Sequence, residues 1–461
     1  MFVRNRAQLL GSVGQERHGL SVRRRAFPLL FIIALLLLAA GCRRAASPEG
    51  WTPPTAQGDT LYVSIENGKL AALEPQGPAL SSASPTASAA ATPTATFPAS
   101  SSGSPLPSTT GSPTATVTPP AVSPSNGAPA AASFRIRWEF PKDDKASCGG
   151  GPEESRKLEG IYGAPVVRGN KVYFGAYDGN VYALDTATGA CAWAFKTDGP
   201  IIGGLALAVG DTPAADRLYA ASDDGKLYAL NPESGVAMNV FDAGSSIWTT
   251  PLINGNNIYF GTVAGTAYAL RSDTLAPVWS KPFETEAALI SDPVLAGDKV
   301  IIGGIGWKLF ALDAKTGNPA WDQPVKGDNW FWGRPLVDGK TIYAPNLDHK
   351  VYAVNADTGA AVWPQPFKAD DGVRASPLLA GGSLIVADRE GNIFSVDPAT
   401  GAEQRPPTIL SRTILSDPVP FGGDVLVMVQ GGNLYHIDPR GEAAPRLVAA
   451  SFASATPAVS P

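Results

Sequence analysis

The chain has 461 residues, a formal net charge of −5 and 44% hydrophobic residues, an ordinary hydrophobic content for a globular protein. Its 49 Gly and 42 Pro suit many short strands joined by tight turns. Because the chain is acidic and has no basic run beyond residue 41, the composition argues against nucleic-acid binding.

The N-terminal segment has the pattern of an export signal. Three Arg at residues 23–25 precede an almost wholly apolar run, residues 27–40, which is short for a membrane-spanning helix. The run ends in Leu-Ala-Ala-Gly-Cys, with the Cys at Cys42, and this motif resembles a bacterial lipobox. We predict that residues 1–41 are a signal peptide and that the lipidated Cys42 and residues 42–50 tether the protein to a membrane. An uncleaved signal anchor is the alternative.

A unit of about 42 residues repeats through most of the remaining chain. Each copy has an apolar run, a turn, a strand similar to Tyr-Ala-Leu-Asp, then Thr-Gly and often Trp. A Pro precedes each unit, and the later ones are spaced 42, 42, 42 and 41 residues apart: Pro251, Pro293, Pro335, Pro377 and Pro418. A fixed period of this length is typical of radially repeated folds.

Each unit divides into four predicted strands. In the unit near Trp248 these are residues 249–253, 258–260 and 267–270, with a fourth strand beginning at residue 277. Gly, Asn and Asp separate the runs, as in β-hairpins. Four short antiparallel strands per repeat predict the blades of an all-β, β-propeller fold.

The number of blades depends on the region before residue 134. Seven copies of the Tyr-Ala-Leu strand lie after it, and residues 51–75 contain three strands of an eighth copy in the same register. Residues 76–133 are rich in Ser, Thr, Pro and Ala, and we predict that they form a disordered insertion. The strand that ends at Trp138 then completes the first blade.

We therefore predict an eight-bladed propeller. Residues 51–75 supply the first three strands of blade 1, and residues 134–450 supply the remainder of the propeller. Residues 451–461 are predicted to be a disordered tail. The alternative is a seven-bladed propeller with residues 51–75 as an N-terminal arm.

The phrase Ala-Leu-Asp-x-x-Thr-Gly-x-x-x-Trp is complete at residues 183–193 and 311–321, and nearly so at 353–363. It resembles the tryptophan docking motif of pyrroloquinoline-quinone-like (PQQ-like) propellers. Physically, Asp and Gly build a turn while Tyr and Trp fill the space between blades, so these Trp are expected to be packing residues. Asn239 and Arg405 replace the Trp in two units, and we expect those junctions to pack differently.

The same resemblance raises the possibility of a quinoprotein enzyme. Such dehydrogenases hold their cofactor with an adjacent Cys-Cys disulfide, a calcium ion and an Asp base. This sequence has no Cys-Cys pair, its Asp-Gly turns lack the spacing of a calcium loop, and only His349 and His436 follow the leader. We therefore expect no enzymatic activity, no metal and no cofactor, with PQQ and calcium as the alternative.

The export signal, the lipobox and the repeat together are similar to the BamB family of lipoproteins, which belong to the outer-membrane β-barrel assembly machinery. This resemblance implies a non-enzymatic scaffold that binds a protein partner. We expect a monomer, exported and anchored by lipid at the cell surface or the periplasmic face of the envelope. The alternatives are a PQQ-dependent oxidoreductase and a carbohydrate- or peptide-binding sensor.

Two cysteines remain beyond the lipobox, Cys148 and Cys191. Export would place them where disulfides persist, so a bridge between them is one possibility. Two separate thiols are the other, because the sequence does not show whether their Cα atoms come within bonding range.

The mouth of the central channel is the expected binding site, because the first strand of each blade lies there and loops on a rigid scaffold often carry function. The residue three before each repeat Pro is often large, and the residue just before the Pro is often polar. The candidates are Trp248, Asp292, Trp330, Phe331, Trp332, Arg334, Arg374 and Asp417. Alternatively, these side chains plug the channel and pair Arg334 or Arg374 with Asp292 or Asp417.

Overall fold

The structure, a computed structural model, describes residues 52–65, 68–76, 133–142, 148, 158–212 and 215–449. These residues lie in one compact unit and form 32 strands in eight four-stranded sheets. No helix in the described ranges is long and apolar enough to cross a membrane. The predicted signal peptide, Cys42, the tether, residues 77–132 of the predicted insertion and the predicted tail lie outside the described residues.

The strands run in chain order, four to a blade. Blade 1 contains β1 (Thr55–Gln57), β2 (Thr60–Ile65), β3 (Lys69–Gln76) and β4 (Ser133–Phe140). Blade 2 contains β5 (Val166–Arg168), β6 (Lys171–Gly175), β7 (Asn180–Asp185) and β8 (Cys191–Lys196). Blade 3 contains β9 (Ala206–Ala208), β10 (Arg217–Ala221), β11 (Lys226–Leu230) and β12 (Ala237–Asp242). Blade 4 contains β13 (Leu252–Asn254), β14 (Asn257–Gly261), β15 (Thr266–Arg271) and β16 (Phe283–Glu284).

The second half follows the same plan. Blade 5 contains β17 (Val294–Ala296), β18 (Lys299–Gly303), β19 (Lys308–Asp313) and β20 (Val325–Lys326). Blade 6 contains β21 (Leu336–Asp338), β22 (Thr341–Asn346), β23 (Lys350–Asn355) and β24 (Phe367–Lys368). Blade 7 contains β25 (Leu378–Ala380), β26 (Ser383–Ala387), β27 (Asn392–Val396) and β28 (Glu403–Ile409). Blade 8 contains β29 (Val419–Phe421), β30 (Asp424–Val429), β31 (Asn433–Ile437) and β32 (Arg446–Ala449).

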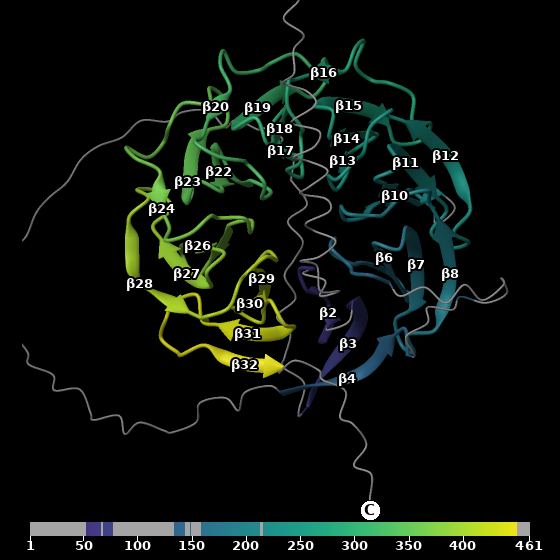
Figure 1. Cartoon of the computed structure of the whole chain (residues 1–461), viewed down its shortest axis with the longest axis horizontal. Helices are drawn as coiled ribbons and strands as arrows, with labels where there is room; N and C mark the ends of the chain where they lie inside the picture. Colours follow the sequence, from purple (N-terminus) through teal and green to yellow (C-terminus); the bar gives the residue numbers. More distant parts are fainter. Residues whose placement is uncertain are drawn as a thin grey trace, which may run out of the picture. The chain divides into compact units, whose positions relative to one another are not determined.

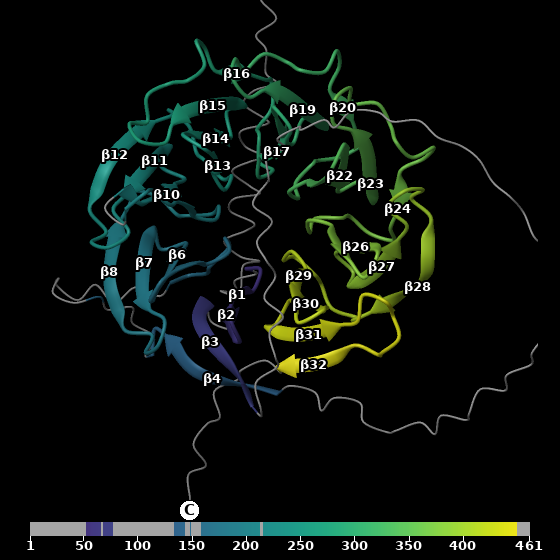
Figure 2. The ribbon, with the colours of Figure 1, turned by 180° about the vertical axis from the view of Figure 1, so that it is seen from behind.

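The blades form a ring with their first strands toward the centre and their fourth strands at the rim (Figures 1 and 2). Within every blade, neighbouring strands are antiparallel. The eight-bladed prediction is confirmed, and the seven-bladed alternative is wrong. Strands β3 and β4 pair from Leu70↔Phe140 to Gln76↔Ser133, so the segment before residue 77 is an integral blade and not an arm.

The hydrophobic core lies between neighbouring blades. One cluster, for example, joins Tyr173 and Trp193 of blade 2 to Leu205 and Leu218 of blade 3. The middle strands are apolar along almost their whole length because both faces are covered, as β6 and β14 show. Each blade therefore depends on its neighbours for burial of its apolar surface.

Five blade junctions share one contact. The indole Nε1 of the docking Trp, which lies on the fourth strand or in the segment just before it, donates to a backbone carbonyl of the next blade, as Trp321 does to Ala356 O at 3.0 Å. The ring lies against a Gly of that blade: a Cβ added to Gly359, which has φ of 73°, would lie 2.8 Å from Cδ2 of Trp321. The same pairs are Trp138 with Thr186 and Gly189, Trp193 with Pro232 and Gly235, Trp279 with Ala314 and Gly317, and Trp363 with Pro398 and Gly401. The docking Trp are thus packing residues.

Three blades lack the docking Trp, and two of them, blades 3 and 7, keep the junction in different ways. Arg405 imitates the indole: its Nη2 donates to Pro439 O at 2.6 Å, and its guanidinium lies against Gly441. At Asn239, the residue in the Gly position of the next blade is Leu275, which has φ of 58° and is buried. Leu275 fills the space that an indole occupies elsewhere.

Blade 8 closes the ring against blade 1 through a shared apolar cluster, and a polar group of side chains lies within blade 8 itself. Asp424 Oδ2 accepts from Arg446 Nη2 at 3.0 Å and lies 3.1 Å from His436 Nδ1. Burial lowers the pKa of His436, which favours its neutral form. Phe421 packs beside it and contacts Phe134 of blade 1 with ring centroids 6.1 Å apart.

The structure bonds Cys148 to Cys191 in a disulfide, with Cα atoms 5.2 Å apart. Cys191 is the first residue of the outer strand β8. The bridge therefore holds the segment that follows blade 1 against the rim of blade 2.

Candidate binding site at the channel mouth

Hydrogen bonds link the segments that lead into the first strands at three of the eight blade junctions. Thr250 Oγ1 accepts from Gly204 N at 2.7 Å, and Asp292 Oδ1 accepts from Thr250 N at 2.6 Å. Farther round the ring, Asp417 Oδ1 accepts from Ser376 N at 2.7 Å. The polar side chain before the repeat Pro thus reaches back to the same position of the preceding blade. These contacts stabilise the inner ring.

Asp292 has the strongest pKa change among the mouth carboxylates for which a shift is resolved. Burial raises its pKa from an ordinary 3.8 to about 6, although the hydrogen bond from Thr250 and the charge of Arg334 oppose this rise. A carboxylate held in this way by a backbone amide is tied into the scaffold. Its first role is to join blade 5 to blade 4.

The aromatic candidates divide into exposed and buried residues. Trp330 and Trp332 stack with ring centroids 5.9 Å apart and an interplanar angle of 24°, and both are partly exposed. The guanidinium carbon of Arg374 lies 4.6 Å from the centre of the Trp332 ring, within the range of a cation–π interaction. Phe331 is only 1% exposed and packs on Tyr352, so it belongs to the core and offers no surface to a ligand.

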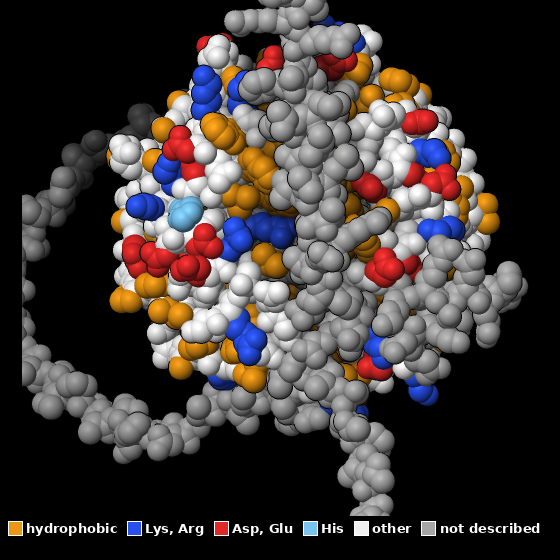
Figure 3. All heavy atoms as spheres, in the orientation of Figure 1, with side chains coloured by type: hydrophobic (Ala, Val, Ile, Leu, Met, Phe, Trp, Pro, Cys, Tyr) orange, Lys and Arg blue, Asp and Glu red, His pale blue; other side chains and the backbone are white. Residues whose placement is uncertain are grey.

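Trp248 lies at the mouth in another part of the ring. Its Nε1 donates to Asp223 Oδ1 at 2.7 Å, which fixes the indole to the turn between β10 and β11. The ring remains partly exposed. Arg334 is exposed and is not buried in the channel. Its positive charge lowers the pKa of Asp292 in part. Figure 3 shows basic side chains beside hydrophobic ones at the centre of the ring.

Two residues in hairpin turns were missed by the sequence reasoning. The turns between second and third strands use a Gly with positive φ in most blades, such as Gly179 and Gly265. Blades 5 and 6 have Trp307 (φ 61°) and His349 (φ 70°) there. Positive φ is uncommon for such side chains, and strained residues often cluster at functional sites. A comparison of the turn position across the repeats would have identified both.

Acidic side chains gather on the loops near His349. Asp370 and Asp371 follow β24, and His349 Nε2 lies 3.7 Å from Asp371 Oδ1. Figure 3 shows this acidic area over the part of the ring where β22 to β27 lie in Figure 1. No group of three or more His, Cys, Asp or Glu suited to a metal ion occurs among the described residues.

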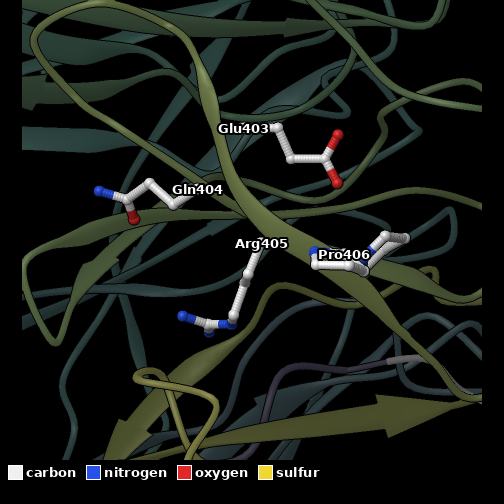
Figure 4. Close-up of a pocket in the computed structure, with 5 residues that line it drawn as sticks. Glu403, Gln404, Arg405 and Pro406 are labelled. Atoms are coloured by element: carbon white, nitrogen blue, oxygen red, sulfur yellow. The ribbon is translucent and has the colours of Figure 1, made fainter.

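A shallow groove of about 410 Å³ lies on the rim of blade 7, lined by Glu403, Gln404, Arg405, Pro406 and Pro407. Figure 4 shows the Arg405 side chain directed away from that of Glu403. Because Arg405 is engaged with Pro439 and Gly441, this groove is a by-product of the substituted docking contact.

The family of the chain follows from its repeats. A family model described as outer membrane protein assembly factor BamB matches residues 154–240, 212–405 and 327–451, which together span more than half of the chain. The chain belongs to the BamB family. The predicted PQQ-like repeat and the resemblance to BamB are thus confirmed.

One of two similar solved structures supports the fold. The crystal structure of BamB from Moraxella catarrhalis superposes with a TM-score of 0.56 at 15% identity, over 83% of this chain and 92% of that protein. A computationally designed protein, Ika8, gives a TM-score of only 0.41 at 14% identity, over 59% of this chain and 94% of Ika8. At these identities the BamB structure supports the shared propeller fold.

A curated relative is a beta-alanine-activating enzyme of Danio rerio, 28% identical over 101 residues. The match covers 22% of this chain and 9% of that enzyme. The chain therefore spans only a small part of that relative.

Proposed function

We propose that this protein is a non-enzymatic scaffold of the cell envelope, exported and anchored by lipid at Cys42, that binds a partner protein at the channel mouth. Membership of the BamB family supports the scaffold role and an envelope location associated with the outer membrane. The leader and lipobox support export and anchoring. The partner belongs to the machinery that assembles outer-membrane β-barrels.

The observation that carries the proposal is the difference between the carboxylates and the large side chains at the mouth. Its carboxylates are engaged within the scaffold: Asp292 and Asp417 accept backbone amides of the preceding blade. Its large side chains are partly exposed: Trp248, Trp330, Trp332 and Arg374. Trp and Arg are the residues that most often dominate protein–protein binding energy. This arrangement favours recognition of a surface over acid–base chemistry.

The partner surface should accept flat aromatic groups beside a positive charge. Two contacts orient the ring of Trp332. Trp330 stacks on it, and the guanidinium carbon of Arg374 lies 4.6 Å from the centre of the Trp332 ring. A preorganised aromatic side chain loses little conformational freedom on binding. An apolar patch of the partner with a nearby carboxylate would match this group.

Photo-crosslinking in native membranes tests the proposal. A benzophenone amino acid at Trp330 should crosslink to β-barrel assembly components, and the Trp332→Ala and Arg374→Ala variants should each reduce the yield at least about tenfold. The matched control carries the same probe at Lys315, an exposed residue in the turn between β19 and β20, at the opposite end of the strands. Crosslinks to glycan alone, or a quinone absorbance band at one cofactor per purified chain, would overturn the scaffold role.

A further inference from the structure

The outer strand of blade 3 carries an exposed apolar row. Val236, Met238 and Val240 are 63%, 40% and 49% exposed, and they occupy alternate positions on or just before β12. Met238 and Val240 lie at alternate positions with the half-buried Asn239 between them, so both point to the exposed side. Met238 is the extra residue of a β-bulge, because Ala229 pairs with Asn239 and Leu230 with Ala237. Val236 extends this exposed apolar row just before the strand. The corresponding row on blade 2 consists of small residues, Ala192 and Ala194.

The backbone edge of β12 is also open in the described structure. Strand β12 is the end of its sheet and pairs with β11 alone, from Lys226↔Asp242 to Leu230↔Ala237. It lies at the rim of the ring (Figure 1). A sheet edge presents backbone N–H and C=O groups that another strand can pair with.

Most other outer strands have features that discourage such pairing. Three of them, β16, β20 and β24, are only two residues long and follow Pro282, Pro324 and Pro366. Strands β4 and β32 carry Arg side chains, and β28 contains two Pro. Strand β8 is bridged at Cys191 to Cys148. Charge, Pro, short length and coverage protect most edges, and β12 has none of these four before Asp242. A bulge at Met238 interrupts its pairing with β11, as similar bulges do on β4 and β8.

Aromatic contacts with blade 4 nevertheless hold strand β12 in place. Phe241 packs edge-on against Tyr268 of blade 4, with ring centroids 5.3 Å apart, and against Phe260 at 6.2 Å. The open edge therefore belongs to an ordered strand, which reduces the entropic cost of pairing.

The charges at the two ends of the strand indicate what pairs with it. Asp242 is exposed at one end, and Glu233 precedes the other. Two copies paired antiparallel about Met238 would set Asp242 of each copy opposite Ser234 of the other and next to Glu233, whose carboxylate lies 2.5 Å from Lys171 Nζ. No free basic side chain of β12 would then meet Asp242 at either end. A strand with apolar side chains in its middle and basic side chains at its ends fits better.

We propose that β12 binds an extended segment of a partner protein by β-strand addition, through apolar side chains at alternate positions flanked by Lys or Arg. The main-chain hydrogen bonds supply affinity, and the row of Val236, Met238 and Val240 selects the apolar side chains. This surface is separate from the mouth and does not depend on the function proposed there.

A fluorescein-labelled peptide Lys-Val-Thr-Val-Thr-Val-Lys provides the test, with the purified soluble chain and fluorescence anisotropy as the readout. Binding should be lost at least about tenfold when Pro replaces the central Val of the peptide, because Pro cannot donate to a ladder. The double variant Met238→Lys/Val240→Lys should weaken binding similarly. Its matched control, Ala192→Lys/Ala194→Lys on β8, should bind as the wild type does, and so should Trp332→Ala.

Each remaining outcome decides the proposal. Absence of binding up to about 1 mM peptide, or equal binding by the Met238→Lys/Val240→Lys variant whose fold is verified by its thermal unfolding, would overturn it. A concentration-dependent dimer in analytical ultracentrifugation that this variant abolishes would assign the edge to a second copy instead. Slower amide hydrogen exchange in β12 on peptide binding would support strand addition directly.

Discussion

The rim and the mouth of this propeller use the same repeat in opposite ways. At the rim, five junctions keep one contact in which an indole lies over a Gly and donates to a carbonyl of the next blade, as Trp321 does with Gly359 and Ala356. At the mouth, the residue before the repeat Pro changes from blade to blade: Thr250, Asp292, Arg334, Ser376 and Asp417. The repeat is strict where it sets geometry and variable where it faces the channel.

Variation at the mouth does not by itself mark a binding residue. Asp292 and Asp417 differ from Thr250, yet all three accept a backbone amide of the preceding blade. Trp330, Trp332 and Arg374, which we propose for recognition, are partly exposed and contact one another. The mouth therefore contains two groups of side chains, those that bond neighbouring blades together and those that are partly exposed to solvent.

The largest expected effect on stability comes from removing a docking indole at the rim. Trp321→Ala should lower the free energy of unfolding by about 3–5 kcal/mol, because it empties a buried space and leaves Ala356 O without its donor. Guanidinium chloride unfolding followed by fluorescence and circular dichroism measures the change. Arg405→Ala is the matched control, and it should cost only about 1 kcal/mol because it removes one hydrogen bond from a partly exposed site.

Equal losses in the two variants would contradict the distinction between indole and guanidinium junctions. A loss below about 1 kcal/mol for Trp321→Ala would contradict the docking role itself. The disulfide-bonded chain should be used throughout, so that Cys148 and Cys191 stay paired in both variants.

The fold could be read from the sequence because the repeat states it many times. The register of residues 51–75 was enough to place a blade whose fourth strand lies more than fifty residues farther along, and the pairing of Gln76 with Ser133 agrees. The substitutions at Asn239 and Arg405 were also visible. The packing of these two junctions could not be predicted, because it depends on a residue of the next blade. That residue is Leu275 at the Asn239 junction and Gly441 at the Arg405 junction.

The mouth was predicted less well, for a physical reason. A run such as Trp330-Phe331-Trp332 does not show which ring turns inward, and the structure buries Phe331 between blades. Nor does a sequence show that Arg374 lies over an indole. The sequence pattern does not place Trp307 and His349 at left-handed turn positions, because such positions are expected to contain Gly.

A rim junction can also be rebuilt to sharpen the comparison. Asn239→Trp alone should destabilise the protein by about 2 kcal/mol, because Leu275 fills the place where an indole would lie. Leu275→Gly alone should destabilise it similarly by leaving a cavity. The double variant should recover most of both losses, giving a favourable coupling of about 2 kcal/mol in a double-mutant cycle of unfolding free energies. Additive losses would show that indole and Gly do not form a unit at this junction.

The last prediction tests the mouth through the pH dependence of stability. Because the pKa of Asp292 is raised from 3.8 to about 6, the folded protein binds more protons than the unfolded chain between these values. The contribution of Asp292 to stability should therefore be greatest below about pH 4 and fall by up to about 3 kcal/mol as the pH rises through 6. The unfolding free energy of the wild type minus that of Asp292→Asn isolates this step, since the Asn carbonyl can still accept from Thr250 N. A difference that rises with pH would mean that the buried carboxylate is stabilised by Arg334 more than it is penalised by burial, and Asp292 would then be an ion-pair residue of the mouth rather than a link between blades.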